Sequence, residues 1–331
     1  MGDSPRAVFI NWFPYHGRSD GIARCLGIPA WFHDGGTGPT VVRELRRWRD
    51  TNRLLRRERP EAVLVMQPPI IVLWAIRRHA RRTSMRIAGD LHTGVFDEPG
   101  NRLALRPTLR MLRRYGMAVV TNEALRSVAE AHGCPALVLH DPIEAAECDP
   151  SDPADPELAA IVRDAYVLVP LAYAHDEPID ALLDAARATP DLTWVLTGRA
   201  PRQVAARAPS NVRFPGYVSN DDFLRMVGRA GVVVAMTKNE HTMQRAAYEA
   251  LSFGRPLVTS DTAVLREYYG GAAEIVAPRA DDVAAGVRRA LADPAAVERM
   301  LTLRERRIAE QHAALETLRE WLLTGRLPDG R

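Results

Sequence analysis

Short apolar runs alternate with segments of helical periodicity along almost the whole sequence. The runs are rich in Val, Ile and Leu and end at Gly, Pro or polar residues, which is typical of β-strands. Because they are continuously apolar, they indicate parallel strands that are covered on both faces. The predicted strands are 7–12, 62–66, 86–89, 117–121, 136–139, 166–171, 193–197, 212–214, 232–236, 256–260 and 274–277.

The segments between these runs have the spacing of amphipathic helices. The alternation of strands and helices predicts βαβ units, and therefore an α/β fold with parallel sheets. A last stretch, 294–324, predicts one or two further helices. The clearest predicted helices before it are 40–57, 103–115, 178–188, 221–230, 243–253 and 281–291.

A chain of 331 residues is long enough for two domains of roughly 150 residues each. The stretch 148–156 carries a proline at every third position from Pro150 onward, which neither a helix nor a central strand accepts, so we place the linker there. We predict an N-terminal Rossmann-like domain (1–147), a C-terminal Rossmann-like domain (157–302) and a helical tail (303–331). The two domains are expected to face each other across a cleft.

Composition excludes several classes of protein. The most apolar stretch, 62–76, is interrupted by prolines and is shorter than the roughly 20 residues of a membrane span. No signal peptide is recognisable at the N-terminus. Cys25, Cys134 and Cys148 form no CxxC pair, so neither a zinc site nor a disulfide framework is indicated. We therefore expect a cytoplasmic protein.

The net charge of +3 is unevenly spread. Residues 1–145 hold 22 arginines against 14 acids, and the arginines cluster in 43–59, 77–86 and 102–114. Two readings stay open: solvated helix faces, or a surface that meets anionic lipid at the inner membrane face or a phosphorylated acceptor. Nucleic acid is disfavoured because no aromatic residues are interleaved at a stacking spacing.

The most informative stretch, 232–258, predicts a strand, a polar loop, a helix, a glycine stop and a second strand. Thr242 is a plausible N-cap, and Gly254 ends the helix. A helix N-terminus at the end of a strand is a ready site for a pyrophosphate. Arg245 in the first turn can add a bidentate contact to a phosphate oxygen.

Three neighbours of Arg245 are further candidates for this site. Glu249 lies on the same helix face and can accept ribose hydroxyls, as acids do in other dinucleotide folds. The alternative is an i,i+4 surface salt bridge between Arg245 and Glu249. His241 can donate to a phosphate or a sugar hydroxyl, or it is a surface or capping histidine. Glu240 precedes it in the same loop.

This stretch resembles the donor-binding region of GT-B glycosyltransferases, especially the retaining enzymes of family 4. Glu249-Ala250 followed by Gly254-Arg255-Pro256 matches the second half of that family's pattern. The first acid of the family's pair is displaced, because the matching position holds His241 and Glu240 stands one position earlier.

The resemblance spans roughly 166–291. It implies that Gly198 and Arg199, at a strand end, meet the nucleotide. The basic residue that often follows the first strand of this domain is missing from 172–178, so the resemblance leaves the phosphate charge to Arg199 or Arg245.

In the first half, the loop after strand 7–12 contains Gly17, Arg18 and Gly21. Glycines there permit a close backbone approach, and in GT-B enzymes this loop faces the cleft, so Gly17 and Arg18 are candidate ligand contacts. The loop lacks a full GxGxxG pattern, which disfavours a redox dinucleotide.

Asp90 and His92 follow strand 86–89 and are the candidate catalytic residues. An Asp beside a His can deprotonate an acceptor hydroxyl. Alternatively Asp90 caps a helix and His92 is structural. If the enzyme retains configuration, as the resemblance implies, the pair only positions the acceptor.

These observations predict a glycosyltransferase, of hexosyltransferase type, that uses a UDP- or GDP-sugar as substrate and needs no cofactor. Metal independence is expected because Asp20, Asp34 and Asp90 are isolated and form no DxD motif. The acceptor is a glycan, a lipid-linked molecule or a small molecule, and polysaccharide biosynthesis is one setting for it. Two alternatives stay open: a nucleotide-sugar 2-epimerase of the same fold, and a GT-B binding subunit without activity.

Overall fold

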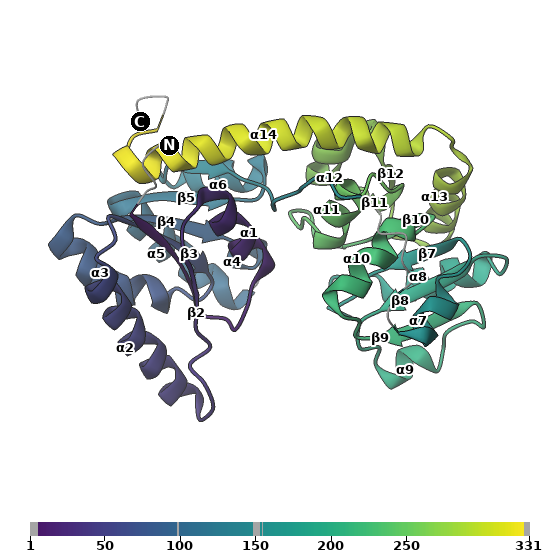
Figure 1. Ribbon diagram of the computed structural model, residues 1–331, viewed down its shortest axis with the longest axis horizontal. Coiled ribbons are helices and arrows are strands. Elements are labelled where there is room, and N and C mark those ends of the chain that lie inside the picture. Colours follow the sequence, from purple (N-terminus) through teal and green to yellow (C-terminus); the bar gives the residue numbers. More distant parts are fainter. Residues whose placement is uncertain (1–5, 98, 148–152, 154, 328–331) are drawn as a thin grey trace. The chain divides into compact units, whose positions relative to one another are not determined.

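The computed structural model describes residues 6–97, 99–147, 153 and 155–327, and the chain divides into two units (Figure 1). Unit 1 comprises Met1–Pro142 together with Glu310–Arg331, and unit 2 comprises Ile143–Ala309. This division differs from the predicted one in two ways: the boundary lies between Pro142 and Ile143, before the predicted linker, and the end of the chain joins the first unit instead of forming a tail. Part of the predicted linker, 148–152 and 154, lies outside the described residues.

Unit 1 is built on a six-stranded sheet in the order β2-β1-β3-β4-β5-β6, and every pairing is parallel. The predicted strands of this half are confirmed with small changes at their ends. Only β2 was missed, because it is three half-buried residues at the sheet edge and has no apolar run. The strands are β1 (Ala7–Asn11), β2 (Ala30–Phe32), β3 (Ala62–Gln67), β4 (Arg86–Leu91), β5 (Gly116–Val120) and β6 (Ala136–Val138).

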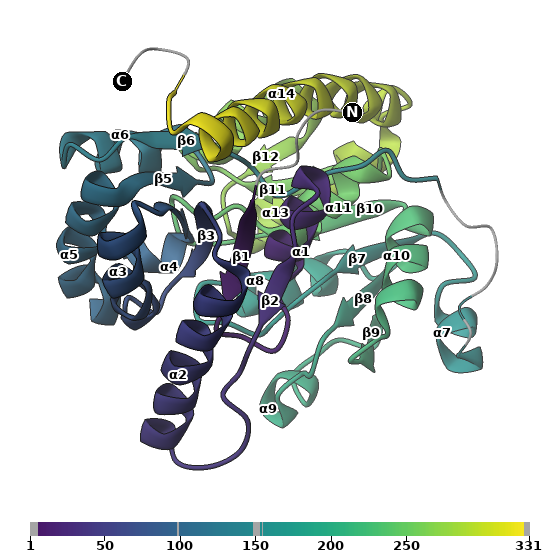
Figure 2. The ribbon, with the colours of Figure 1, turned by 60° about the vertical axis from the view of Figure 1, so that its left-hand side comes forward.

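Helices cover both faces of this sheet, and Figure 2 shows α3 and α5 on one side of it and α1 on the other. One core cluster joins the sheet to buried leucines of α2, α3 and α5, such as Leu55, Leu73 and Leu112. The helices of unit 1 are α1 (Gly17–Leu26), α2 (Thr40–Glu58), α3 (Ile71–Thr83), α4 (Thr93–Asp97), α5 (Pro99–Tyr115) and α6 (Glu123–Ala131).

The last helix, α14 (Ala296–Thr324), is a single helix of 29 residues. Its C-terminal part packs in the second core cluster of unit 1, where Leu318 and Trp321 join Phe9 of β1. Arg319 donates from both terminal nitrogens to the carbonyl oxygens of Leu26 and Cys25, at 3.1 and 3.0 Å, and so caps the end of α1. The two ends of the described chain therefore build one core.

Unit 2 contains a second six-stranded parallel sheet in the order β12-β11-β10-β7-β8-β9. The strand order reverses between β7 and β10, which is the point where doubly wound sheets bind their ligands. Its elements are β7 (Tyr166–Val169), β8 (Thr193–Thr197), β9 (Val212–Gly216), β10 (Val232–Ala235), β11 (Leu257–Ser260), β12 (Glu274–Val276), α7 (Pro156–Ile161), α8 (Ile179–Ala188), α9 (Arg202–Ala205), α10 (Asn220–Arg229), α11 (Arg245–Ser252), α12 (Ala263–Tyr269), η1 (Gly270–Ala272) and α13 (Ala280–Ala292).

The predicted parallel sheets are thus confirmed in both units. Within the described part of the chain, no helix combines the length and the apolar character that crossing a bilayer requires.

Candidate functional site

A cavity of about 510 Å³ opens in unit 2 at the carboxyl ends of β7, β8 and β10. It lies at the reversal of strand order, and its volume is in the range of small-molecule sites. Four of the predicted contacts line it: Gly198, Thr242, Arg245 and Glu249. The predictions that Arg199, Glu240 and His241 contact a ligand have no such support, because none of the three lines the cavity.

The loop after β7 folds around a carboxylate. Glu177 is buried and accepts hydrogen bonds from the backbone N–H of Ala172 and Ala174, at 3.1 and 2.8 Å. Burial raises the pKa of Glu177, and the two backbone hydrogen bonds only partly oppose this rise. The preceding residue, Asp176, accepts a hydrogen bond from the Thr237 hydroxyl at 2.8 Å. This bond connects the loop to the residues that follow β10.

Asp176 and Glu177 both line the cavity, and sequence reasoning did not name either as a site residue. The signal was present, since two acids follow a buried strand by a few positions. The sequence analysis noted only that this loop has no basic residue, and did not consider Asp176 and Glu177 as site residues.

Gly198 is at the end of β8 and has φ +86°, which favours glycine. A Cβ at this position would collide with the carbonyl oxygen of Leu171, two residues after the end of β7. The chain after β7 and the end of β8 can approach this closely because residue 198 has no side chain. Arg199 instead lies with its guanidinium 5.7 Å from the ring centroid of Tyr217, which is itself part of the cavity wall.

Helix α11 begins two residues later than predicted. Its first residue is Arg245 and its N-cap is Gln244, so the assignment of Thr242 as N-cap is wrong. The amide of Gln244 is engaged elsewhere, because Nε2 donates to the Met236 carbonyl at 2.7 Å and holds the loop against the end of β10. Arg245 and Ala246 line the cavity, so the first turn of α11 still faces it.

The side chains of Arg245 and Glu249 form the i,i+4 salt bridge that the sequence left open as an alternative. Nε of Arg245 donates to Oε1 of Glu249 at 2.8 Å, and the Arg245 side chain is 56% exposed. The Glu249 side chain is only 14% exposed, so the exposed Arg245 is the partner that can turn away to a ligand. The charged residues of the cavity wall are Arg245 and the three carboxylates Asp176, Glu177 and Glu249.

The loop between β10 and α11 places Glu240 in a structural contact. Its Oε1 accepts from the backbone N–H of Ala263, the first residue of α12. An acidic side chain at a helix N-terminus is favourable because of the helix dipole. Glu240 therefore connects the loop to the next βα unit.

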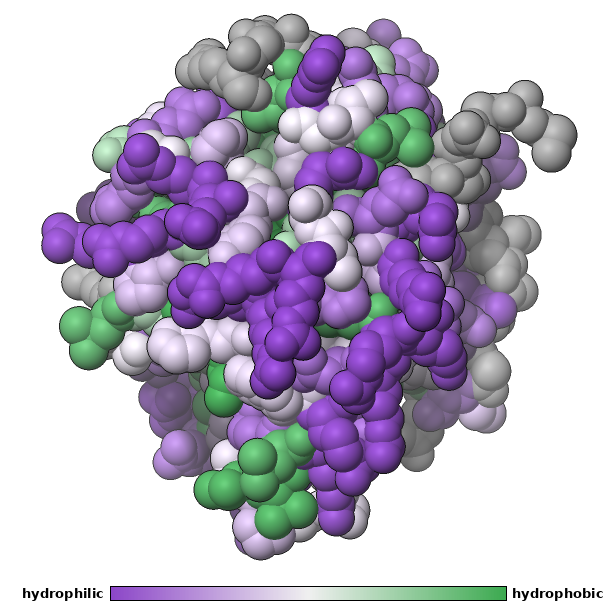
Figure 3. Space-filling model, turned by 90° about the vertical axis from the view of Figure 1, so that its left-hand side faces the viewer, coloured by the Kyte–Doolittle hydropathy of each residue, from purple (hydrophilic) through white to green (hydrophobic). Residues whose placement is uncertain are grey.

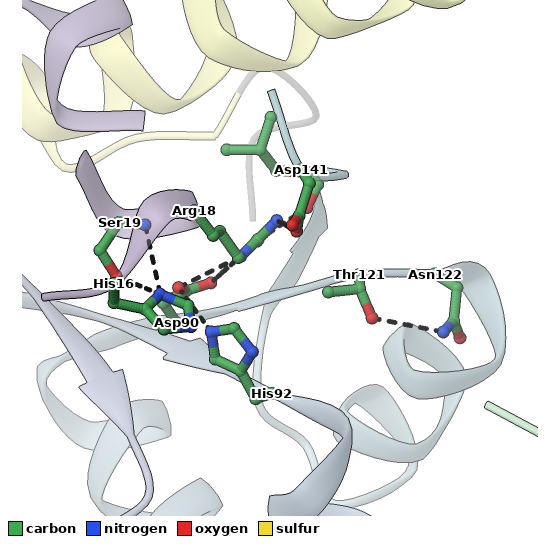
Figure 4. Close-up of polar contacts among 9 residues, drawn as sticks. His16, Arg18, Ser19, Asp90, His92, Thr121, Asn122 and Asp141 are labelled. Carbon is green, nitrogen blue, oxygen red and sulfur yellow. Dashed lines mark hydrogen bonds and ion pairs between the residues drawn. The ribbon is translucent and has the colours of Figure 1, made fainter. Parts of the chain in front are cut away.

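The second candidate site lies in unit 1, where Asp90 is the penultimate residue of strand β4 (Figure 4). Its carboxylate is 1% exposed and receives hydrogen bonds from Nε and Nη2 of Arg18, the latter at 2.8 Å. Arg18 also donates to Asp141 at 3.0 Å and to the Leu139 carbonyl at 2.8 Å. The prediction that Arg18 contacts a ligand needs correction, since its buried donors bind residues of unit 1.

His92 is the exposed member of this cluster. Its Nε2 lies 3.4 Å from Oδ2 of Asp90, and its side chain is 24% exposed. Burial raises the pKa of Asp90, but the Arg18 charge and the contact with His92 outweigh it and hold the pKa well below its usual range. Asp90 therefore stays ionised and can orient the imidazole, while the opposite nitrogen of His92 is the one suited to a substrate proton.

His16, which follows β1, packs edge-to-face on His92 with ring centroids 4.7 Å apart. Its Nδ1 accepts from the Ser19 N–H and so caps α1, whose first residue is Gly17. Burial, and secondly the charge on His92, lower the pKa of His16 to about 4, so it is neutral at pH 7. Sequence reasoning missed His16; its position in the loop between the first strand and the helix at Gly17 was the available signal.

Two more residues at this edge of the sheet are buried and polar. Asn122 caps α6 by accepting from the Leu125 N–H at 3.0 Å. Asn11, the last residue of β1, is fully buried, and its side-chain amide has no hydrogen-bond partner among the described residues. The described residues contain no group of three or more His, Cys, Asp or Glu side chains arranged to hold a metal ion.

Comparison with known proteins identifies the second half of the chain. Residues 170–293 match the family model of glycosyl transferases group 1. This segment contains the whole cavity of unit 2, and the match confirms the resemblance found in the sequence. A comparison with curated proteins gives no match.

Solved structures similar to this chain show that the fold is GT-B. HepE of Anabaena in complex with UDP-glucose has a TM-score of 0.70 at 14% identity, covering 96% of this chain and 97% of that one. Sucrose-phosphate synthase of Thermosynechococcus elongatus has a TM-score of 0.71 at 13% identity, covering 95% and 97%. A putative UDP-N-acetylglucosamine 2-epimerase of Listeria monocytogenes has a TM-score of 0.65 at 13% identity, covering 96% of both chains.

Proposed function

We propose, from the premise that residues 170–293 are a glycosyl transferases group 1 domain in a GT-B fold, that the protein transfers a sugar from a nucleoside diphosphate sugar to a hydroxyl acceptor. The observation that carries the proposal is the cavity at the strand-order reversal of unit 2, with the first turn of α11 in its wall. That the HepE structure holds UDP-glucose supports a uridine donor.

The reaction breaks the bond between the sugar and a diphosphate, so negative charge grows on the departing oxygen. In our proposal Arg245 and the positive end of α11 stabilise this charge. Arg245 would leave Glu249 and make charge-assisted hydrogen bonds to phosphate oxygens. Glu249 would then be available to accept the ribose hydroxyls, the role that the family resemblance implies.

The acceptor side of the proposal uses the polar cluster of unit 1. His92, oriented by Asp90, positions the acceptor hydroxyl and accepts its proton. Asp90 does not take this proton itself, because its oxygens are buried against Arg18. Asp90 and Arg18 are therefore positioning residues in this proposal, and His92 is the catalytic residue. The chemical class of the acceptor stays open.

A thermal-shift comparison of UDP, GDP, ADP and TDP tests the donor site. A nucleotide at about 100 times its Kd should stabilise the protein by about 2.7 kcal/mol. Arg245→Ala should abolish this response. Arg288→Ala is the matched control, because Arg288 is a half-exposed arginine of unit 2 that pairs with Asp191 away from the cavity. An equal response in both variants would refute the placement of the donor.

The charges of the cavity favour one second candidate, a GT-B subunit that no longer binds a sugar nucleotide. The cavity wall carries three carboxylates and one arginine, so its net negative charge repels a diphosphate. Flat melting curves for every nucleotide would support this candidate over the transferase. Formation of a 2-epimer without an acceptor would instead indicate epimerase chemistry.

A further inference from the structure

A second cavity, of about 580 Å³, lies in unit 1 between α3 and α5. Five arginines line it: Arg77, Arg81, Arg110, Arg113 and Arg114. The face of unit 1 that carries α2, α3 and α5 is largely covered by hydrophilic side chains, as Figure 3 shows. The proposed function makes no use of this cavity.

Among the residues that the structure describes, no carboxylate lines the cavity. Many arginines elsewhere in the described chain pair with an acid, as Arg47 does with Glu44 and Arg289 with Glu274. None of the five cavity arginines forms such a pair within the described residues. Gathering five like charges without a counter-charge is unfavourable, and the cost is lowered when an anion binds among them.

Three of the cavity arginines, Arg77, Arg81 and Arg114, are close to the phenol of Tyr115. Nε of Arg81 donates to the Tyr115 oxygen at 3.1 Å, and the Arg114 guanidinium lies 5.7 Å from the centroid of the Tyr115 ring. Burial raises the pKa of Tyr115, but the three guanidinium groups lower it by more than burial raises it. The pKa of Tyr115 therefore lies below its usual value. The contact with Tyr115 therefore engages one donor of Arg81, and most other guanidinium donors of the cluster have no hydrogen-bond partner within the described residues.

The cavity lies away from the Asp90 and His92 cluster of the same unit. Arg81, Arg113 and Arg114 are in the last turns of α3 and α5, which lead into the first residues of β4 and β5. The cavity therefore extends to the amino ends of these strands, whereas His92 follows the carboxyl end of β4. A ligand held here is not the group that reacts at His92.

We propose that the α3–α5 cavity binds a phosphate-bearing ligand. Guanidinium groups match phosphate oxygens with paired, charge-assisted hydrogen bonds, and several on neighbouring helix turns suit a ligand with more than one phosphate charge. Trp74, which is 51% exposed, and the half-buried Met111 form an apolar part of the wall. Free phosphate esters and anionic lipid headgroups share this chemistry.

Titration calorimetry of the full chain with tripolyphosphate tests the proposal. The double variant Arg77→Ala/Arg110→Ala should weaken binding at least about tenfold, since each charged hydrogen bond is a substantial share of such affinity. Arg78→Ala/Arg106→Ala is the control, because it removes the same charge from the same helices at exposed positions outside the cavity wall. The control should change the affinity less than about threefold.

The cavity variant should keep its melting response to UDP, which separates this site from the proposed donor site. Sedimentation with phosphatidylglycerol vesicles, compared with phosphatidylcholine vesicles, distinguishes a lipid headgroup from a soluble ester. Binding of either probe that falls in the cavity variant and not in the control supports the proposal. Failure of the wild-type protein to bind both probes, or equal loss in both variants, overturns it.

Discussion

Replacing Arg18 by methionine should be among the most destabilising single changes in unit 1. Methionine has a similar length but no charge, so the substitution isolates the electrostatic part of the contact. It leaves the Asp90 carboxylate, 1% exposed, without its guanidinium, and leaves the buried Leu139 carbonyl without one donor. Asp141 loses less because its side chain is 21% exposed and can be hydrated.

The expected magnitude follows from the cost of stranding a buried charge. Removing one partner of a buried ion pair costs about 3–5 kcal/mol, and a lost hydrogen bond adds about 1 kcal/mol. The double variant Arg18→Met/Asp90→Leu removes the charge as well as its partner, so it should recover most of this loss. Urea unfolding at pH 7, followed by circular dichroism and tryptophan fluorescence, measures both, with separate transitions allowed for the two units.

The pH dependence gives a second readout of the same contact. In the wild type the depressed pKa of Asp90 adds stability that is present above the unfolded pKa of about 4 and is lost as the pH falls further. In Arg18→Met burial raises the pKa, so the carboxyl takes up a proton and the penalty shrinks between pH 7 and pH 5. A loss below about 1 kcal/mol at pH 7, or a double variant no more stable than the single one, would refute the reasoning.

Three further predictions concern the stability of each unit taken by itself. The pKa of His16 is lowered to about 4, so below pH 6.5 the unfolded state binds more protons than the folded state. The free energy of unfolding should therefore be about 1 kcal/mol lower at pH 5 than at pH 7, a value reduced for the partial exposure of His16. His16→Asn keeps a helix cap and should remove this pH dependence. Leu318→Ala should cost about 2–4 kcal/mol in urea unfolding, because the side chain is fully buried against β1 and α1; an unchanged midpoint would show that α14 is not part of the core of unit 1. Gly254→Ala should destabilise unit 2 by about 1–3 kcal/mol, since φ is +62° and a Cβ would collide with Leu301; differential scanning calorimetry measures it, and a neutral result would mean that the backbone relaxes there.

The strands and the donor-side helix could be predicted because their signals are local. Val232–Ala235 is a continuous apolar run, and Gly254 ends α11 where the sequence places it. The start of α11 could not be fixed so well. Thr242 has the chemistry of a cap, but the chain enters the helix through Gln244, whose amide is tied to the Met236 carbonyl instead.

The role of Arg18 could not be predicted because its partners are remote in sequence. Asp90 is 72 residues away and Asp141 is 123 residues away, and no periodicity connects them. The same holds for α14. Its amphipathic pattern predicts a helix, but not that Trp321 packs in the core built from β1 and α1. Long-range pairing is therefore what separates the predicted elements from the observed unit.

The charge of the unit 2 cavity decides how a diphosphate would be held there. Arg245 is already paired with Glu249, and opening the pair costs about 1 kcal/mol, the upper end for surface pairs, because Arg245 is exposed whereas the Glu249 side chain is 14% exposed. Each charge-assisted hydrogen bond to a phosphate offers about 1.5–3 kcal/mol in return, so the exchange of partners is favourable. Glu177 opposes the ligand less than its charge indicates, because its hydrogen bonds from the backbone N–H groups of Ala172 and Ala174 hold the carboxylate toward the loop backbone. In the proposed donor site, binding would therefore depend on one arginine and one helix terminus, and this is why the Arg245→Ala comparison is decisive.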